Sequence, residues 1–389
     1  MAKPTLRIVV GLAVCAAAAV MLIVDGREAE NATEEARRRQ LAERVFARGD
    51  KNGDGKITPS EFAPGWSGLF KRIDADGDGA ISLEENSAFN ERRARAGRSR
   101  RDADRDRPAP TLADVKYGPH ERNVLDFWKA QSDKPTPLVV FIHGGGFRAG
   151  NKSAANPVDI RKCLDSGVSF AAINYRFRQT VPLTTILKED IARAIQSLRH
   201  QSAEWNIDKA HVAAYGGSAG AGASLWLAVH DDLADPDSED PVRRESTRLS
   251  AAGMRNGQAT YDLEQWAKII GVPESWAETY NFRDDLALYG VKDRTELASP
   301  RVLAMRKELD MLGFMDAGDA PVHLTNLAPN TDPKSLDAIH HHPRHSIAVK
   351  KKCDELGIDA AIVLAATPLT ERVDMLDFFF DKFGMRAKD

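Results

Sequence analysis

A serine among small residues stands out as a candidate for acyl transfer. The segment Gly216-Gly217-Ser218-Ala219-Gly220 follows the apolar run HVAAY and precedes a helical stretch. A serine on a tight strand-to-helix turn must be flanked by small residues, and there its hydroxyl is presented at the edge of the sheet. The helix N-terminus favours negative charge that develops beside it. Ser218 is therefore the candidate nucleophile.

A second glycine-rich segment precedes it in the chain. His143-Gly144-Gly145-Gly146-Phe147 follows the apolar run LVVFI. Such a loop can offer backbone N–H groups to the oxygen of a tetrahedral intermediate. Glycine turns after strands are common in any α/β protein, so either segment alone is modest evidence. The two segments in this order are much stronger evidence for acyl transfer.

Together the two segments resemble the HGGG and G-x-S-x-G motifs of the esterase and lipase group of α/β-hydrolases. The resemblance implies that Ser218 is the nucleophile. It also implies an oxyanion hole built from the N–H of Ala219 and that of Gly144 or Gly145. In this family the order along the chain is serine, acid, histidine, with the acid after the penultimate strand and the histidine after the last.

Two aspartates are candidates for the acid. Asp332 and Asp337 both follow the apolar run PVHLTNL. Counting forward from that strand favours Asp332, whereas counting back from Gly357 of the next helix favours Asp337. We place Asp332 first and keep Asp337 as the alternative.

The histidine that the resemblance implies is missing from its usual place, because no histidine follows His345. A serine hydroxyl without a base is a weak nucleophile at neutral pH, so whether the chain is an enzyme depends on this point. In one interpretation the cluster at 340–345 supplies the base, with His341 and His342 as our choices. In a second, the fold persists without hydrolysis. In a third, the cluster only starts a helix at Pro343 or binds a metal.

Two acidic loops near the N-terminus repeat a pattern of oxygen donors. Positions 1, 3, 5, 7 and 12 of the first loop are Asp50, Asn52, Asp54, Lys56 and Glu61, with position 7 contributing its main-chain carbonyl. The same positions of the second loop are Asp74, Asp76, Asp78, Ala80 and Glu85. A hard cation takes several oxygens in one shell, and the glycine at position 6 permits the sharp turn. One such loop could arise by accident, but two seldom would.

These loops resemble an EF-hand pair, over about residues 34–90, and the resemblance implies Ca²⁺ as the ligand. Ile57 and Ile81 are then expected to form the short β pairing between the loops. A structural staple or an adhesion module is expected rather than a calcium sensor. The alternative is a pair of Asp-Gly surface turns.

The elements that must position the serine alternate along the chain from 111 to 389. The expected strands are LVVFIH, VSFAAINY, HVAAYGG, PVHLTNL and DAAIVLA, and helices are expected at 153–166, 187–200 and 219–230. This alternation is typical of an α/β fold, a mainly parallel sheet with helices on both faces. Taken with the two resemblances, it implies the fold class of an α/β-hydrolase with a small α-helical EF-hand domain. Residues 262–320 interrupt the rhythm as a helical insertion, a candidate lid.

The N-terminal segment predicts export. Lys3 and Arg7 precede an apolar run at 8–24, so residues 1–30 are a signal peptide or a membrane anchor. No A-x-A cleavage site is obvious, and we weigh the two interpretations equally, with a buried soluble helix as a third. The protein is expected to be periplasmic, secreted or anchored in the membrane.

Charge is unevenly distributed along the chain. Residues 91–110 are rich in arginine with interleaved acids, which is typical of a solvated linker, although a basic patch for anionic lipid or polysaccharide is an alternative. The whole chain carries 54 Lys and Arg against 57 Asp and Glu, for a net charge of −3. That balance argues against nucleic acid as a partner. Three cysteines are too few for a disulfide framework.

The sequence as a whole predicts an exported serine esterase acting on a small ester or an acylated polysaccharide. It predicts calcium in the acidic loops and no cofactor for the hydrolase chemistry. The alternative is a catalytically inactive hydrolase-fold protein that binds a ligand or a polysaccharide in a calcium-dependent manner.

Overall fold

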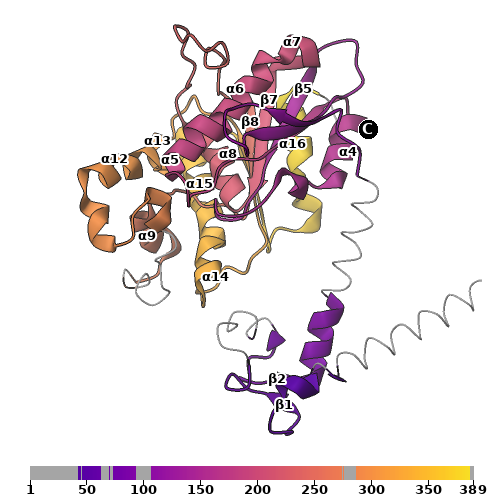
Figure 1. Cartoon of the computed structure of the whole chain (residues 1–389), viewed down its shortest axis with the longest axis vertical. Coiled ribbons are helices and arrows are strands. Elements are labelled where there is room, and N and C mark those ends of the chain that lie inside the picture. The colour runs from indigo at the N-terminus through magenta and orange to yellow at the C-terminus, as the bar shows by residue number, and fades with distance from the viewer. Residues whose placement is uncertain are drawn as a thin grey trace, which may run out of the picture. The chain divides into compact units, whose positions relative to one another are not determined.

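The computed structural model describes residues 43, 44, 46–62, 70, 73–92, 107–273, 275 and 286–385 (Figure 1). The chain divides into two compact units, Met1–Arg105 and Asp106–Asp389. The apolar run at 8–24 lies outside the described residues, as does most of the arginine-rich segment at 91–110. Within the part of the chain that is described, no helix is long and apolar enough to cross a membrane.

The N-terminal unit is organised around one short antiparallel pairing. Strand β1 (Lys56–Ile57) pairs with β2 (Ile81–Ser82), and Ile57 lies opposite Ile81. The expected pairing between the two loops is thus confirmed. The buried side chains around it are Phe46, Ile57, Phe70, Ile73, Ile81 and Phe89. This small apolar core holds the two acidic loops side by side.

The larger unit contains an eight-stranded sheet with the strand order β10-β9-β8-β7-β5-β6-β4-β3. Its strands are β3 (Leu112–Lys116), β4 (Val124–Trp128), β5 (Thr136–Ile142), β6 (Ser169–Ile173), β7 (Ile207–Gly217), β8 (Ala251–Arg255), β9 (Val322–Asn326) and β10 (Ala360–Leu364). The pairings of β3 with β4 and of β4 with β6 are antiparallel, and those from β6 through to β10 are parallel. The carboxyl ends of the parallel strands therefore meet at one edge of the sheet, where ligands of open α/β sheets bind.

Helices cover both faces of this sheet (Figure 1). One apolar layer packs under α4 (Pro157–Asp165) and α16 (Met375–Lys382). The other packs under α6 (Arg193–His200), α8 (Ala219–Val229) and α15 (Pro343–Leu356). The other helices are α5 (Leu183–Thr185), η2 (Ile186–Ala192), α7 (Ser202–Trp205), α9 (Trp266–Ile270), α12 (Pro300–Glu308), α13 (Met311–Phe314) and α14 (Leu336–His340). Single-turn helices are η1 (Lys152–Ala154), η3 (Leu263–Gln265), η4 (Ala287–Tyr289), η5 (Arg294–Ala298) and η6 (Leu369–Glu371).

The expected fold class is confirmed, with differences in detail. All five expected strands form, but β3, β4 and β8 were not predicted. Strand β8 reads AAGMR and lacks the β-branched residues that mark a strand. The helix expected from 153 begins at Pro157, because the side chain of Asn156 accepts the N–H of Val158 and caps it there.

The segment expected as a lid is built of short helices where it is described. Elements η3, α9, η4, η5, α12 and α13 follow one another between 262 and 320, and no strand occurs among its described residues. They form the orange and brown group at the left of the larger unit in Figure 1. The domain boundaries proposed from the sequence stay predictions.

Candidate active site

Ser218 sits at the turn between β7 and α8. Its backbone has φ 53° and ψ −120°, and its N–H donates to the carbonyl of Arg255 at 2.9 Å. A Cβ on Gly216 would lie 2.3 Å from the carbonyl oxygen of Ile142, and one on Gly220 would lie 2.0 Å from it. Only glycine fits at those two positions, so the small residues around Ser218 allow this strained turn to pack against β5.

The imidazole of His341 faces the hydroxyl of Ser218. The distance from Ser218 Oγ to His341 Nε2 is 2.8 Å. On the other side of the ring, Nδ1 lies 3.1 Å from the main-chain oxygen of Asp337 and 3.2 Å from its Oδ1. Because both groups facing Nδ1 are acceptors, the proton belongs on Nδ1 and Nε2 is free to accept from the serine. The structure thus brings Ser218, His341 and Asp337 together.

The carboxylate of Asp337 is far more exposed than the ring it faces. Its side chain is 88% exposed, against 29% for that of His341. Water screens an exposed carboxylate strongly. The main-chain carbonyl of Asp337 is therefore the steadier partner of Nδ1.

Asp332 does not join this group. Its side chain is 94% exposed, and its Oδ1 lies 3.9 Å from Nη2 of Arg344. Asp337 lies four residues before His341, one turn of helix α14 away, whereas Asp332 lies in the loop before that helix. The placement of Asp332 ahead of Asp337 therefore does not match the geometry.

The ring of His342 does not face Ser218 either. Its Nδ1 accepts the N–H of Arg344 at 3.2 Å, and its Nε2 donates to the carbonyl of Thr331 at 2.9 Å. The ring is buried and caps helix α15, in which Pro343 is the first residue. His342 thus has the helix-starting role of our third interpretation.

The remaining histidines of the cluster pack around Trp266. The Trp266 ring packs edge-to-face with the rings of His340 and His345, with centroids 5.5 and 5.2 Å apart. Burial lowers the pKa of His345 to about 3, so that ring is neutral. Among the described residues, the one group of three side chains with metal-ligand atoms close together is made of aspartates in the second acidic loop. The histidines at 340–345 do not form such a group.

The first glycine-rich loop packs directly against the turn that carries Ser218. A Cβ on Gly144 would lie 2.6 Å from the carbonyl oxygen of Gly217, so Gly144 is a packing residue. Gly146 lines the cleft beside Ser218 and Ala219. Hydrogen bonds among the described residues leave the N–H groups of Gly145, Gly146 and Ala219 unused. Gly146 was missed by the sequence reasoning, although the third glycine of the motif was the signal for it.

His143 supports this loop. Its ring is buried and stacks on Tyr175 with centroids 4.1 Å apart. Nδ1 donates to the carbonyl of Gly144 at 2.7 Å, and Nε2 lies 3.4 Å from Nη2 of Arg122. Burial lowers the pKa of His143 to about 4, which keeps the ring neutral.

A small, open cleft lies above Ser218. Its walls are mainly apolar and aromatic, and the lining residues are Gly146, Phe147, Arg178, Ser218, Ala219, Gln258, Tyr261, Trp266, Leu288 and His340. Trp266 and Leu288 belong to the segment 262–320, so that segment forms part of the wall.

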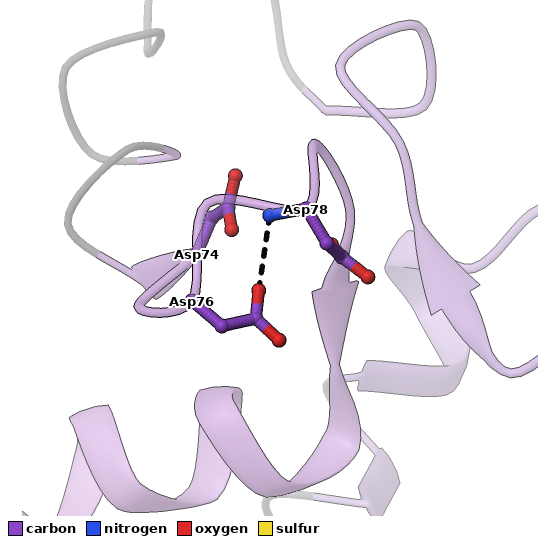
Figure 2. Close-up of side chains that lie close together, drawn as sticks. All are labelled: Asp74, Asp76 and Asp78. Atoms are coloured by element: carbon purple, nitrogen blue, oxygen red, sulfur yellow. Dashed lines mark hydrogen bonds between the residues drawn. The ribbon is translucent and has the colours of Figure 1, made fainter.

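In the N-terminal unit, both acidic loops hold their carboxylates with backbone N–H groups. Figure 2 shows Asp74, Asp76 and Asp78 around the second loop, where Asp78 N–H donates to Asp76 Oδ1 at 3.0 Å. One ligand atom from each of the three lies within 4.8 Å of the others. In the first loop, Asp50 corresponds to Asp74 of the second. Its carboxylate accepts the N–H groups of Gly53 and Gly55 at 2.7 and 2.9 Å.

The glutamates at position 12 complete each loop. Glu85 Oε1 accepts from Ala75 N–H at 2.7 Å, and its Oε2 accepts from Ser82 N–H at 2.9 Å. Hydrogen bonds from Thr58 and from Ser82 lower the pKa of Glu61 and of Glu85, each to about 2. Charged oxygens in this arrangement fit a hard divalent cation.

Comparison with known proteins finds matches in both units of the chain. The BD-FAE family model matches residues 125–269, and the EF hand model matches 41–63 and 68–85. Esterase LipQ of Mycobacterium tuberculosis is 29% identical over 164 residues, which are 40% of this chain and 37% of LipQ. Polcalcin Ole e 3 of Olea europaea is 43% identical over 67 residues, which are 14% of this chain and 75% of the polcalcin.

Solved structures show the same fold in the larger unit. A truncated carbohydrate esterase from gut microbiota superposes with a TM-score of 0.53 at 20% identity, covering 71% of this chain and 97% of the other. The match to LipQ spans little more than a third of that protein, so it does not establish the whole protein's activity. The larger unit thus has an α/β-hydrolase fold whose residues 125–269 match the BD-FAE family model, and an EF-hand pair precedes it in the chain.

Proposed function

We propose that the protein is a serine esterase that hydrolyses carboxylic esters through an acyl-enzyme on Ser218. The single observation that carries the proposal is the 2.8 Å contact between Ser218 Oγ and His341 Nε2. It makes His341 the base, a role for which no histidine follows strand β10. The strained turn at Ser218 and the unused N–H groups beside it supply the rest of the site.

In the first half-reaction, Ser218 Oγ attacks the ester carbonyl carbon while His341 Nε2 takes the hydroxyl proton. The carbonyl oxygen becomes an oxyanion, which accepts hydrogen bonds from the N–H of Ala219 and those of Gly145 and Gly146. The bond to the alcohol oxygen then breaks, and His341 gives its proton to that oxygen. An acyl-enzyme and a free alcohol result.

In the second half-reaction, water takes the place of the alcohol. His341 removes a proton from the water as the oxygen attacks the acyl carbon, and the same N–H groups hold the oxyanion. The bond to Ser218 Oγ breaks, and the serine recovers its proton from His341. The products are a carboxylic acid and the unchanged enzyme, so this chemistry needs no cofactor.

The cleft and the relatives support a small ester or an acylated polysaccharide as substrate. Phe147, Tyr261 and Trp266 line the cleft beside Ser218 and make it largely apolar. LipQ is named an esterase, and the superposed structure is named a carbohydrate esterase.

The N-terminal unit is proposed to bind Ca²⁺ in both loops, as a structural staple rather than as a sensor. Asp50, Asn52, Asp54, the carbonyl of Lys56 and Glu61 would hold one ion. Asp74, Asp76, Asp78, the carbonyl of Ala80 and Glu85 would hold the other. Calcium titration calorimetry tests this: heat of binding is expected, and no binding up to millimolar calcium would refute it.

Export is proposed from the apolar run at 8–24 alone. Cell fractionation of the tagged full chain checks it, and N-terminal sequencing of the recovered protein separates a cleaved signal from a retained anchor. Recovery of uncleaved protein from the cytosol alone would contradict export.

The esterase proposal is tested by hydrolysis of a short chromogenic acyl ester. Ser218→Ala and His341→Ala are each expected to lower kcat by about a thousandfold or more. His211→Ala, a surface histidine paired with Asp208, is the matched control and should leave kcat unchanged. Turnover that survives Ser218→Ala, or a folded wild-type protein that turns over no ester, would overturn the proposal; the latter would favour the inactive-fold alternative.

A further inference from the structure

His341, the proposed base, lies outside the strands of the sheet. His341 is the C-cap of the five-residue helix α14, and the chain between β9 and α14 contains no regular element. A catalytic group must be kept within about 0.5 Å of its productive position. Something other than the sheet pairing must therefore fix the backbone of His341.

Two buried carboxamide side chains meet this part of the backbone. Nδ2 of Asn326 donates to the carbonyl of His341 at 3.0 Å, and Nε2 of Gln258 donates to the carbonyl of His340 at 2.7 Å. Asn326 is 0% exposed and Gln258 is 5% exposed. These two carbonyls belong to the end of a helix, where the last carbonyls lack partners within the helix.

The two donors come from neighbouring strands of the sheet. Asn326 is the last residue of β9, and Gln258 follows the end of β8. The Oδ1 of Asn326 accepts the N–H of Ala328 at 3.0 Å, so both ends of its carboxamide are engaged. The rigid edge of the sheet is thereby tied to the backbone that carries the imidazole.

We propose that Asn326, together with Gln258, acts as a positioning residue that holds His341 Nε2 at Ser218 Oγ. This inference rests on the proposed esterase function. Asn326 is absent from the residues that line the cleft, so it meets the substrate only through His341. Asn326 carries no charge, so Asn326→Ala removes the hydrogen bond to His341 and leaves the net charge around the base unchanged.

The test compares Asn326→Ala and Asn326→Asp with wild type. The aspartate keeps the size of the side chain but places an oxygen where the amide donor stood, facing the His341 carbonyl. Both variants are expected to lower kcat by about 10- to 100-fold, because a misplacement of 1 Å can cost about 10²-fold. KM for a chromogenic ester should stay within about twofold, and phosphonylation of Ser218 by a fluorophosphonate should slow by the same factor as kcat.

Asn123→Ala is the matched control. Asn123 is also buried, at 1% exposed, and hydrogen-bonds the N–H of His120 and the hydroxyl of Tyr117, outside the proposed site. It should lower the melting temperature and leave kcat and the phosphonylation rate unchanged. Asn326 variants that melt earlier yet keep both rates, or an equal loss of rate in Asn123→Ala, would overturn the inference. If wild type is neither active nor phosphonylated at Ser218, the proposed function itself fails, which is a distinct result.

Discussion

His341 is held between a hydroxyl and a main-chain carbonyl rather than between a hydroxyl and a buried acid. Its Nε2 faces Ser218 Oγ, and its Nδ1 faces both the carbonyl and the carboxylate of Asp337. The carbonyl cannot be removed by changing the side chain. Orientation of the ring should therefore depend only weakly on the carboxylate.

Asp337→Asn is expected to lower kcat by less than about tenfold. Removal of the buried acid from a triad costs about 10⁴-fold, but this carboxylate is 88% exposed and shares its role with a carbonyl that the variant keeps. Steady-state hydrolysis of a chromogenic ester measures the effect. Asp354→Asn, another exposed helix aspartate that pairs with Lys350, is the control. A loss of a thousandfold or more would show that Asp337 acts as a full triad acid.

At the scale of elements, the two acidic loops differ in how the position-5 carboxylate is held. Asp54 Oδ2 accepts from the neutral side-chain amide of Asn52 at 2.9 Å. Asp78 Oδ2 instead accepts from the ammonium of Lys56, in the other loop, at 3.0 Å. This ion pair raises the pKa of Lys56. The N–H of Ala80 and the ion pair with Lys56 lower the pKa of Asp78. Lys56 therefore competes with a cation for a ligand of the second loop.

Lys56→Gln is expected to tighten calcium binding at the second loop by up to about fivefold in low salt, the size of an exposed ion pair. The Lys56 carbonyl proposed for the first loop remains in place. Calorimetric titration at two salt concentrations measures the change, which should shrink in high salt. Lys51→Gln is the control, because it removes one positive charge from the same loop and leaves the ion pair between Lys56 and Asp78 in place. Equal effects of the two variants would contradict the competition.

How much of the candidate active site could be predicted depends on whether a residue is positioned by its sequence neighbours or by the packing of helices. Ser218 and the calcium-ligand pattern depend on neighbours close in sequence, so their motifs were sufficient to select them. The choice between His341 and His342 depends on the turn between α14 and α15, which points one ring at Ser218 and buries the other as a helix cap. The choice between Asp332 and Asp337 depends on where α14 begins. No local spacing carries that information.

At the scale of the whole molecule, the parallel core of the sheet was predictable because apolar runs alternate with amphipathic helices. The strands that were missed lack that pattern. Strand β8 begins with three small residues and has no β-branched one. Strands β3 and β4 form the antiparallel edge, where all five residues of β3 and two of the five in β4 are exposed or partly exposed. The glycine-rich loop was predictable as a motif, but which of its N–H groups face the cleft depends on the packing of Gly144 against Gly217.

Buried neutral histidines make the stability of the hydrolase unit depend on pH. Burial lowers the pKa of His143 to about 4 and that of His345 to about 3, and it lowers the pKa of His323 as well. The unfolded chain binds these protons near pH 6.5, before the folded one does. The free energy of unfolding should therefore fall as the pH drops from about 6.5 towards 4, by at most about 1.4 kcal/mol per pH unit for each ring.

Asp319 opposes this trend in part, because burial raises its pKa to about 6 and its protonation favours the folded state on acidification. Three histidines outweigh one aspartate, so the net slope keeps its sign. Urea denaturation of the full chain at pH 7.5, 6 and 5 measures it. His345→Gln is expected to flatten the slope, and an unfolding free energy that rises on acidification would contradict this assignment.

Activation of Ser218 by His341 can be measured by covalent trapping of the serine. Wild-type protein is incubated with a fluorophosphonate, and the intact mass and the modified peptide are determined over time. We expect a single adduct on Ser218, no adduct in Ser218→Ala, and labelling slowed by about a hundredfold or more in His341→Ala. Labelling of Ser218 at the wild-type rate in His341→Ala, or an adduct on another residue, would contradict it.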